Sequence, residues 1–244
     1  MGRSLEQEKR VGSEPRRVAA VAVRIIPFAM ISERALRADP DIVAAWVAGW
    51  ALSRGVAAPV PAYGGFRVDV GQPDQKARYV FAEASDRVAE ASRAIAEPHI
   101  FIKVCAPPEV VAPLLTSGWA IKPLSFMMTT EALYEADVQL PDGYRRKWEP
   151  LPGGYVATLL SEDGEIAASG RVFLVGSTAV FDQIVTSPNH RRRGLGRVVM
   201  NALGNLALQG GATMGSLVAT PDGRALYSNL GWRLHALYTT AVRE

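Results

Sequence analysis

The chain has 244 residues, of which 48% are hydrophobic and 21% charged, and its net charge at pH 7 is +3. This length permits one large domain or two small ones with a sizeable core, and the composition is that of a globular protein. A general nucleic-acid binder concentrates more positive charge on one face, so the small net charge argues against that class. Cys105 is the only cysteine and there are three scattered histidines, which excludes an intrachain disulfide and a Cys/His zinc site.

No segment of the sequence has the 18 or so consecutive apolar residues that a transmembrane helix needs. The longest candidate, VAAVAVRIIPFAMI at residues 18–31, is interrupted by Arg24. Residues 1–17 are charged and lack the apolar region of a signal peptide. We therefore expect a cytoplasmic protein without a membrane partner, in which residues 1–17 form a flexible tail.

The first half of the chain, residues 18–134, alternates between expected strands and helices. Residues 18–26 favour a strand. Asp39 and Pro40 are a typical N-cap and first helical residue, and Gly55 ends the helix that follows. Residue alternation and capping signals then predict strands at 64–70 and 77–81, a helix at 85–97, a strand at 99–106, a short helix at 107–119 and a strand at 120–130.

Residues 135–154 are rich in proline, glycine and charge, and their weak apolar periodicity predicts a linker. The second half, residues 155–244, opens with three strands joined by tight turns, which predict an antiparallel meander. Leu195, Val199 and Leu203 then repeat at helical spacing. The expected elements are strands at 155–161, 165–175 and 178–187, a helix from 194 to 209, a strand at 212–220, a short helix at 221–232 and a strand at 232–243.

The two halves share an internal repeat. Residues 100–124 align without gaps on residues 213–237, which lie 113 positions later. Both copies are expected to contain a strand, a short helix, a Gly-Trp pair and a strand. The identical pairs are Ala106/Ala219, Pro108/Pro221, Ala112/Ala225, Gly118/Gly231, Trp119/Trp232 and Leu124/Leu237. This shared order favours a duplicated unit, in which Leu114 of the first copy stands opposite Tyr227 of the second.

The stretch SPNHRRRGLGRVVMNAL, residues 187–203, places three arginines and two glycines at the expected start of a helix. Backbone N–H groups at a helix start lack intrahelical partners and favour an anion. Gly194 and Gly196 let the main chain approach phosphate oxygens, and the arginines add charge-assisted hydrogen bonds. A pyrophosphate fits this arrangement, whereas Val199 breaks the dinucleotide motif and no P-loop sequence is present. A solvated charge run and a nucleic-acid patch are the alternatives.

Arg191-x-x-Gly194-x-Gly196, after the strand VFDQIVTSP, resembles the acyl-CoA loop of the GCN5-related N-acetyltransferase (GNAT) superfamily, whose signature is Gln/Arg-x-x-Gly-x-Gly/Ala. Downstream, ALYSNLGW resembles the Leu-Tyr-x-x-x-Gly-Phe/Trp pattern of the same family. The resemblance spans residues 155–244, and residues 18–134 resemble the same fold with the site eroded. It implies an α/β fold of two GNAT-like units, each a twisted mixed β-sheet flanked by helices, of which only the second is catalytic.

The resemblance also implies a cosubstrate, acetyl-CoA, and the residues that contact it. Backbone amides of the arginine-glycine loop would hold the pyrophosphate, and the end of the preceding strand would bond the pantetheine arm. The implied cofactor-binding residues are Ile184, Val185, Thr186, Arg191, Arg192, Arg193, Gly194, Leu195, Gly196, Arg197 and Thr220. Thr220 departs from the family, which often has Asn there. No metal is implied.

Two catalytic residues follow from the same resemblance. Tyr227 takes the position of the general acid that protonates the leaving thiolate, and a core aromatic is the alternative interpretation. Asp182 is the nearest carboxylate for a general base, and a structural carboxylate is an equal alternative. The implied reaction moves an acetyl group from acetyl-CoA to a primary amine, expected to belong to a small molecule.

Other functions stay open at this stage. The chain could instead be a non-catalytic acyl-CoA sensor or interaction module, an acetyltransferase acting on protein amines, or a protein associated with DNA or RNA. The presence of Tyr227 argues against the first and the small net charge against the last, so we expect no nucleic-acid partner. A homodimer is left open, and the sequence does not identify the acceptor amine.

Overall fold

The computed structural model describes residues 38–131, 133 and 135–244. The tail predicted over residues 1–17 and the strand predicted at 18–26 lie outside the described residues. Within the described part of the chain, no helix is both long and apolar enough to cross a membrane.

Helix α1 (Pro40–Arg54) begins and ends where the sequence predicts. The side chain of Asp39 caps it by accepting a hydrogen bond from the backbone N–H of Asp41, and Gly55 ends it with a φ of 63°. Pro123 divides the strand predicted at 120–130, because proline cannot donate to a strand ladder. The other elements of the first half are β1 (Val60–Ala62), β2 (Gly65–Gln72), β3 (Gln75–Phe81), α2 (Asp86–Ala94), β4 (Ile100–Val104), α3 (Pro108–Val111) with a 3₁₀ turn (Ala112–Leu114), β5 (Trp119–Ile121) and β6 (Ser125–Thr130).

The second half contains the predicted meander, the predicted helix after the arginines and the predicted strand-helix-strand unit. Their observed bounds are β8 (Gly154–Ser161), β9 (Ile166–Val175), β10 (Thr178–Thr186), α4 (Leu195–Gln209), β11 (Met214–Ala219), α5 (Pro221–Asn229) and β12 (Arg233–Arg243). A short 3₁₀ turn (Pro188–His190) lies between β10 and α4.

One strand, β7 (Tyr144–Leu151), lies inside the segment for which the sequence predicts a linker. It pairs with β8 along its whole length. It forms one of the two edges of the sheet, and all of its side chains are half-buried or exposed, so its sequence lacks the apolar alternation of a buried strand. Exposed Arg145, Arg146 and Lys147 on this edge disfavour pairing with another chain.

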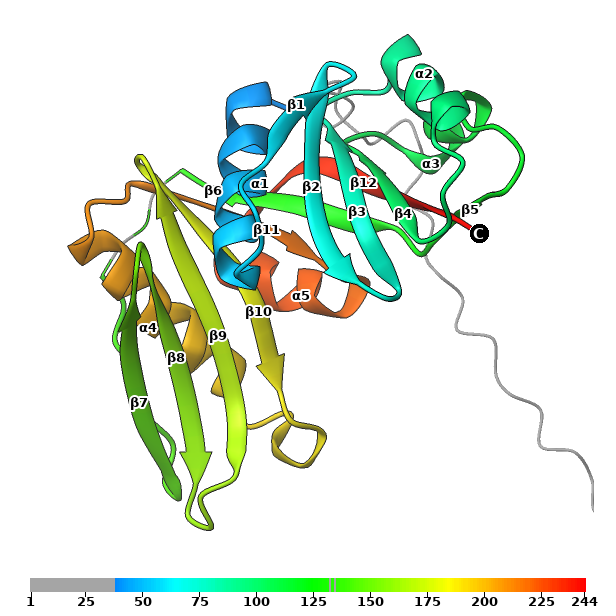
Figure 1. Cartoon of the computed structure of the whole chain (residues 1–244). Coiled ribbons are helices and arrows are strands. Elements are labelled where there is room, and N and C mark those ends of the chain that lie inside the picture. Colours follow the sequence, from blue (N-terminus) through cyan, green and yellow to red (C-terminus); the bar gives the residue numbers. More distant parts are fainter. Residues whose placement is uncertain (1–37, 132, 134) are drawn as a thin grey trace, which may run out of the picture. The chain divides into compact units, whose positions relative to one another are not determined.

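The strands of the described residues form one twelve-stranded sheet, in the order β1-β2-β3-β4-β12-β6-β11-β10-β9-β8-β7, with β5 beside β12 (Figure 1). Strand β12 joins the two halves. Its residues 233–238 pair with β6, and its residues 239–242 pair with β4. Strand β6 pairs in turn with β11. Each half therefore contributes its last strand to the ladder of the other half.

The pairing pattern repeats between the halves. Strands β3 and β4 are parallel, as are β10 and β11. Ala241 pairs with Ile121, and Leu234 pairs with Met128. Met128 lies 113 positions before Ala241, and Leu234 lies 113 positions after Ile121. The shift found in the sequence thus relates paired residues in the structure, which supports the repeat. The described residues of both halves belong to one compact unit, and the division into two domains stays a prediction.

Helices cover both faces of the second half's sheet. Trp46 of α1 and Val180 of β10 share one hydrophobic cluster, and α1 contacts β9 and β10. On the opposite face, Val199 of α4 packs in a second cluster with Ala179 and Phe181 of β10. The second half therefore uses a helix of the first half to bury one face of its strands, and this helix reaches the functional site described below.

Two glycines inside helices form a matched pair that tests this packing. A Cβ at Gly49 of α1 would lie 2.5 Å from the Cβ of Val180, whereas a Cβ at Gly204 of α4 would meet no heavy atom within 4 Å. We expect Gly49→Ala to lower the free energy of unfolding by about 1–3 kcal/mol through overpacking, which outweighs alanine's better helix propensity. Gly204→Ala should raise it by about 0.5–1 kcal/mol. Urea unfolding measures both; a Gly49→Ala protein as stable as the wild type would contradict the contact between α1 and β10.

Candidate functional site

The site begins where two parallel strands separate. The β10–β11 ladder runs from Thr178 to Val180 on β10 and ends at Ser216 on β11. Beyond that point β10 stays paired with β9, and β11 stays paired with β6, so the two strands diverge (Figure 1). A register shift lies in β10 between Asp182 and Val185, and Gln183 in the shift has a left-handed φ of 55°. The separation opens a gap in the sheet along residues 183–186.

The predicted pantetheine-binding residues lie on this diverging part of β10. Ile184 is half-buried and packs against the hydrophobic cluster under α4. Val185 is 58% exposed, although it is a large apolar residue within a strand. Thr186 is half-buried and ends the strand. An exposed valine beside a free backbone edge provides an apolar and hydrogen-bonding surface for an extended ligand.

The equivalent strands of the first half do not separate. The β3–β4 ladder continues to Phe81 and Val104, and it is extended by a hydrogen bond from the N–H of Cys105 to the carbonyl of Phe81 at 2.9 Å. The described residues of the first half therefore contain no gap equivalent to the one between β10 and β11. This agrees with the absence of an RRRGLG sequence from the first half.

The arginine-glycine loop leads directly from the end of β10 to the start of α4. Gly194 is the N-cap residue of α4 with a left-handed φ of 78°. A Cβ on Gly194 would meet no atom within 4 Å, so glycine is required there by its backbone angle. A Cβ on Gly196 would lie 3.0 Å from Leu226 of α5 and 3.7 Å from the hydroxyl of Thr186. The helix start, the strand end and α5 therefore converge on Gly196. The N–H of Arg197 donates to the carbonyl of Gly194 at 3.0 Å, so the N–H groups of Leu195 and Gly196 are those that the first turn offers to an anion.

Two of the three loop arginines have partners in the protein. Arg193 donates a hydrogen bond to the hydroxyl of Tyr144 on β7 at 2.9 Å, and this hydroxyl lies 3.0 Å from Nδ1 of His190. Arg191 reaches the carbonyl of Thr186 at 3.5 Å. Arg192 and Arg197 are exposed, as are Arg191 and Arg193. The sequence analysis missed Tyr144, because β7 itself was missed.

Tyr227 lies on α5 and is 8% exposed. Its ring centroid is 6.3 Å from that of Trp232, which packs edge-on against Phe181 of β10 at 5.2 Å. Burial, and secondarily the negative charge of Asp182, raise the pKa of Tyr227 to about 12. The phenol is therefore protonated at neutral pH and can donate its proton. At the equivalent position of the first half, Leu114 packs against a hydrophobic cluster.

Asp182 is bound to the C-terminal end of α1. Its carboxylate accepts hydrogen bonds from Ser53 Oγ at 2.9 Å and from Nε and Nη2 of Arg54 at 2.7 and 3.2 Å. This geometry favours the interpretation of Asp182 as a structural carboxylate. The sequence analysis did not identify Ser53 or Arg54, because they are about 130 positions away and no local pattern signals the contact.

Thr220 is engaged in capping α5. Its hydroxyl accepts a hydrogen bond from the N–H of Gly223 at 3.2 Å, as an N-cap threonine does. The hydroxyl proton stays available for a ligand. Within the described ranges, no group of three or more His, Cys, Asp or Glu side chains could hold a metal ion.

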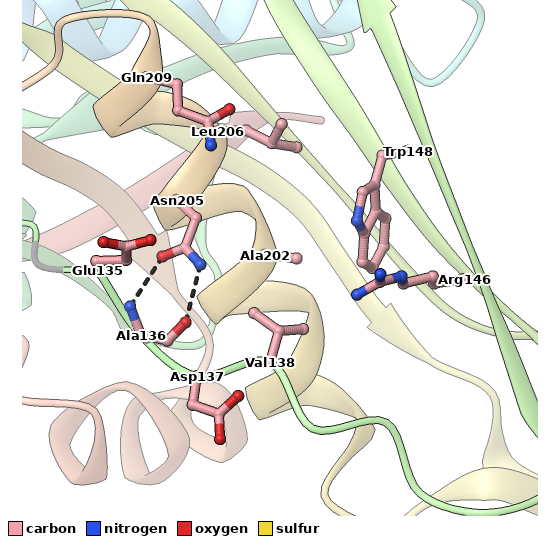
Figure 2. A pocket seen from close by; sticks show the side chains of 10 residues that line it. All are labelled: Glu135, Ala136, Asp137, Val138, Arg146, Trp148, Ala202, Asn205, Leu206 and Gln209. Atoms are coloured by element: carbon pink, nitrogen blue, oxygen red, sulfur yellow. Dashed lines mark hydrogen bonds between the residues drawn. The ribbon is translucent and has the colours of Figure 1, made fainter.

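A hollow of about 680 Å³ lies away from this loop, over the C-terminal half of α4. Figure 2 shows Arg146 and Trp148 of β7 on one side of it and Ala202 and Leu206 of α4 on the other. Asn205 pairs with the main chain of Ala136, accepting from its N–H at 2.9 Å and donating to its carbonyl at 2.8 Å. This amide fixes the connection between β6 and β7 against α4, and the predicted cofactor residues do not line the hollow.

Comparison with known proteins identifies a family match in the part of the chain that contains these residues. Residues 124–232 match the sequence model of the acetyltransferase (GNAT) family. This range contains β10, the arginine-glycine loop, α4, β11 and α5. The search of curated proteins found no match.

Several solved structures share the fold. A GCN5-related N-acetyltransferase from Kribbella flavida aligns with a TM-score of 0.60 and 18% identity, over 84% of this chain and 95% of its own. A GNAT-family acetyltransferase from Novosphingobium aromaticivorans gives 0.53 and 16%, over 84% and 99%. A GCN5-related N-acetyltransferase-like protein from Streptococcus suis gives 0.52 and 15%, over 70% and 80%. These likenesses confirm the α/β acyl-CoA N-acyltransferase fold, and the first two extend beyond residues 124–232 into the first half.

The raised pKa of Tyr227 makes a prediction about alkaline stability. The phenol has a pKa near 10 in the unfolded chain and about 12 in the folded protein. Its contribution to stability is therefore complete below pH 10 and is lost as the pH rises through 12. From pH 9 to pH 11, we expect the wild type to lose about 1 kcal/mol more of its free energy of unfolding than Tyr227→Phe does. Denaturant unfolding at both pH values measures this difference, and equal losses would contradict the burial of the hydroxyl.

Proposed function

We propose that this chain, whose residues 124–232 match the sequence model of the acetyltransferase (GNAT) family, is an enzyme of that family that transfers an acetyl group from acetyl-CoA to a primary amine of a small molecule. One observation carries the proposal: the gap between β10 and β11 leads to a helix start that carries Gly194, Gly196 and three arginines. A long ligand with an amide-containing arm and an anionic middle matches this arrangement: the arm would lie along β10, and the anionic part would lie at the start of α4.

The residues present fit such a ligand. The N–H groups at the start of α4, aided by the loop arginines, bind the pyrophosphate. Gly196 has no side chain to keep the main chain away from it, and a Cβ at 196 would also crowd Leu226. The main chain of residues 184–186 bonds the amides of the pantetheine arm, and Val185 covers its apolar part. The thioester is then placed where β10 and β11 separate, beside Tyr227.

The reaction is an attack by the neutral amine on the thioester carbonyl. The nitrogen lone pair forms the new C–N bond, and the C–S bond breaks with its electron pair going to sulfur. Tyr227 donates its proton to the departing sulfur and recovers one from water, which also takes the proton lost by the amine. Holding the two reactants together supplies a further part of the acceleration. Such a role needs a protonated phenol, and burial raises the pKa of Tyr227 further above neutral pH.

The direct test of the function is acetyl transfer itself. The purified protein is mixed with acetyl-CoA, a thiol-detecting reagent and a panel of amines that includes small molecules and a lysine-containing peptide. Release of CoA that depends on a small amine supports the proposal, and release that depends on the peptide would point to protein amines. Tight acetyl-CoA binding without release for any amine would favour a non-catalytic acyl-CoA-binding module.

The loop makes a specific prediction for ligand binding. Gly194→Glu places a side chain and a negative charge at the start of α4, so we expect it to abolish acetyl-CoA binding measured by calorimetry. Gly211→Glu is the matched control: Gly211 also has a positive φ, of 88°, with open space around its Cα, but it follows the opposite end of α4. The control should bind acetyl-CoA as the wild type does. Unchanged affinity in a folded Gly194→Glu protein would contradict the proposed pyrophosphate site.

The general acid makes a prediction for turnover. Tyr227→Phe keeps the ring and its contact with Trp232 and removes only the hydroxyl group that carries the acidic proton. We expect kcat to fall by about 10²–10⁴-fold, the usual worth of general acid catalysis, while affinity for acetyl-CoA is unchanged. The fall should be smaller for thioesters with a better leaving group. Wild-type turnover by the Phe variant, where chemistry limits the rate, would remove Tyr227 from the mechanism.

A further inference from the structure

The C-terminal turn of α1 is tied to the shifted segment of β10 by a dense set of hydrogen bonds. Ser53 and Arg54 together donate three to the carboxylate of Asp182, at 2.7 to 3.2 Å. Gln183 of β10 returns bonds from its amide to the carbonyl and hydroxyl of Ser53, at 3.3 and 3.4 Å. Arg171 of β9 donates to the same carbonyl at 2.6 Å. A helix of the first half is thus bonded to two neighbouring strands of the second.

This cluster is partly shielded from water. The side chain of Asp182 is 16% exposed and that of Arg54 is 42% exposed. The guanidinium of Arg54 meets the carboxylate through two nitrogens, which fixes the orientation of both groups. The guanidinium of Arg54 also lies over the ring of Trp50, with its Cζ atom 5.5 Å from the ring centroid. Arg171 also satisfies a carbonyl at the end of α1, where a cation is favoured by the helix dipole.

The bonded residues are those at which β10 changes register. Gln183 has a φ of 55°, a left-handed value that a non-glycine residue keeps only where its surroundings enforce it. The shift between Asp182 and Val185 lies in the part of β10 that turns away from β11. The hydrogen bonds from α1 act on both residues that enter the shift, Asp182 and Gln183, so they hold the backbone that borders the gap.

We propose that Ser53 and Arg54 are positioning residues, which act through Asp182 and Gln183 to hold the diverging segment of β10 in the shape that binds acetyl-CoA. The inference rests on the proposed function for its ligand. It gives the first half of the chain a defined part in the site, although the ligand itself contacts only the second half. It also gives Asp182 a role other than proton transfer, because its oxygens are directed at α1.

The test compares Arg54→Met and Asp182→Asn, singly and together, in the full chain. We expect each single variant to weaken acetyl-CoA binding about 10-fold by calorimetry, and to raise the KM for acetyl-CoA by more than it lowers kcat. The double variant should be little worse than either single one, because both break the same contact. Arg54→Lys keeps the charge but not the two-nitrogen contact, so it should recover part of the affinity.

A matched control separates this contact from ion pairs in general. Arg67→Met removes another Arg–Asp ion pair, between Arg67 and Asp69 of β2. In this pair, Nη2 of Arg67 lies 2.7 Å from Oδ1 of Asp69. This variant should bind acetyl-CoA with wild-type affinity. A catalytic base at Asp182 predicts a different pattern, in which Asp182→Asn lowers kcat at unchanged affinity and Arg54→Met does not mimic it. That pattern would overturn the proposal.

A second readout does not depend on the proposed function. Amide hydrogen exchange of residues 183–186 in the free protein should become faster in Arg54→Met and Arg54→Lys, while exchange in the middle of α4 stays unchanged. If the wild type binds no acetyl-CoA, the proposed function fails, and the exchange data alone decide about the positioning role. Wild-type exchange at residues 183–186 in a folded Arg54→Met protein would overturn it.

Discussion

Strand β12 is hydrogen-bonded to β6 along residues 233–238 and to β4 along residues 239–242, and the rest of the sheet depends on this double pairing. Because β6 is also the partner of β11, the two halves cannot be separated without breaking β12 from β4, β5 and β6, and β6 from β11. Backbone groups left unpaired inside a covered sheet are costly, so this pairing holds the two halves together. The functional site lies on the side of β11 that faces away from β6.

The site combines a regular framework with one local irregularity. Parallel strands would normally continue side by side, as β3 and β4 do as far as Phe81 and Val104. In the second half the register shift and the left-handed Gln183 turn β10 away from β11, and the helix start at Gly194 lies at the end of the diverging strand. The two halves thus show the same topology with and without the gap. The difference lies in a few residues of one strand and one loop.

Local signals in the sequence predicted the elements that depend on local chemistry. Asp39, Pro40 and Gly55 gave the bounds of α1, and the glycines with the apolar repeat gave the start of α4. Strand β7 was missed because an edge strand with no buried side chain has no apolar alternation. The contact between Arg54 and Asp182 could not be predicted, since it depends on how α1 packs across the sheet. The 113-residue repeat indicated the shared topology, but not that the halves exchange their last strands.

The exchange of last strands also determines the order in which the sheet can form during synthesis. Strand β4 is made early, but one of its neighbours consists of residues 239–242, so its edge stays open while the whole second half is translated. The edge of β6 that pairs with β11 likewise stays open until β11 has been made. An open strand edge can pair with another copy of the chain. A growing chain therefore carries two exposed edges that the finished protein covers with its own later strands, and β12 is the strand whose exchange between neighbouring molecules would cover them instead.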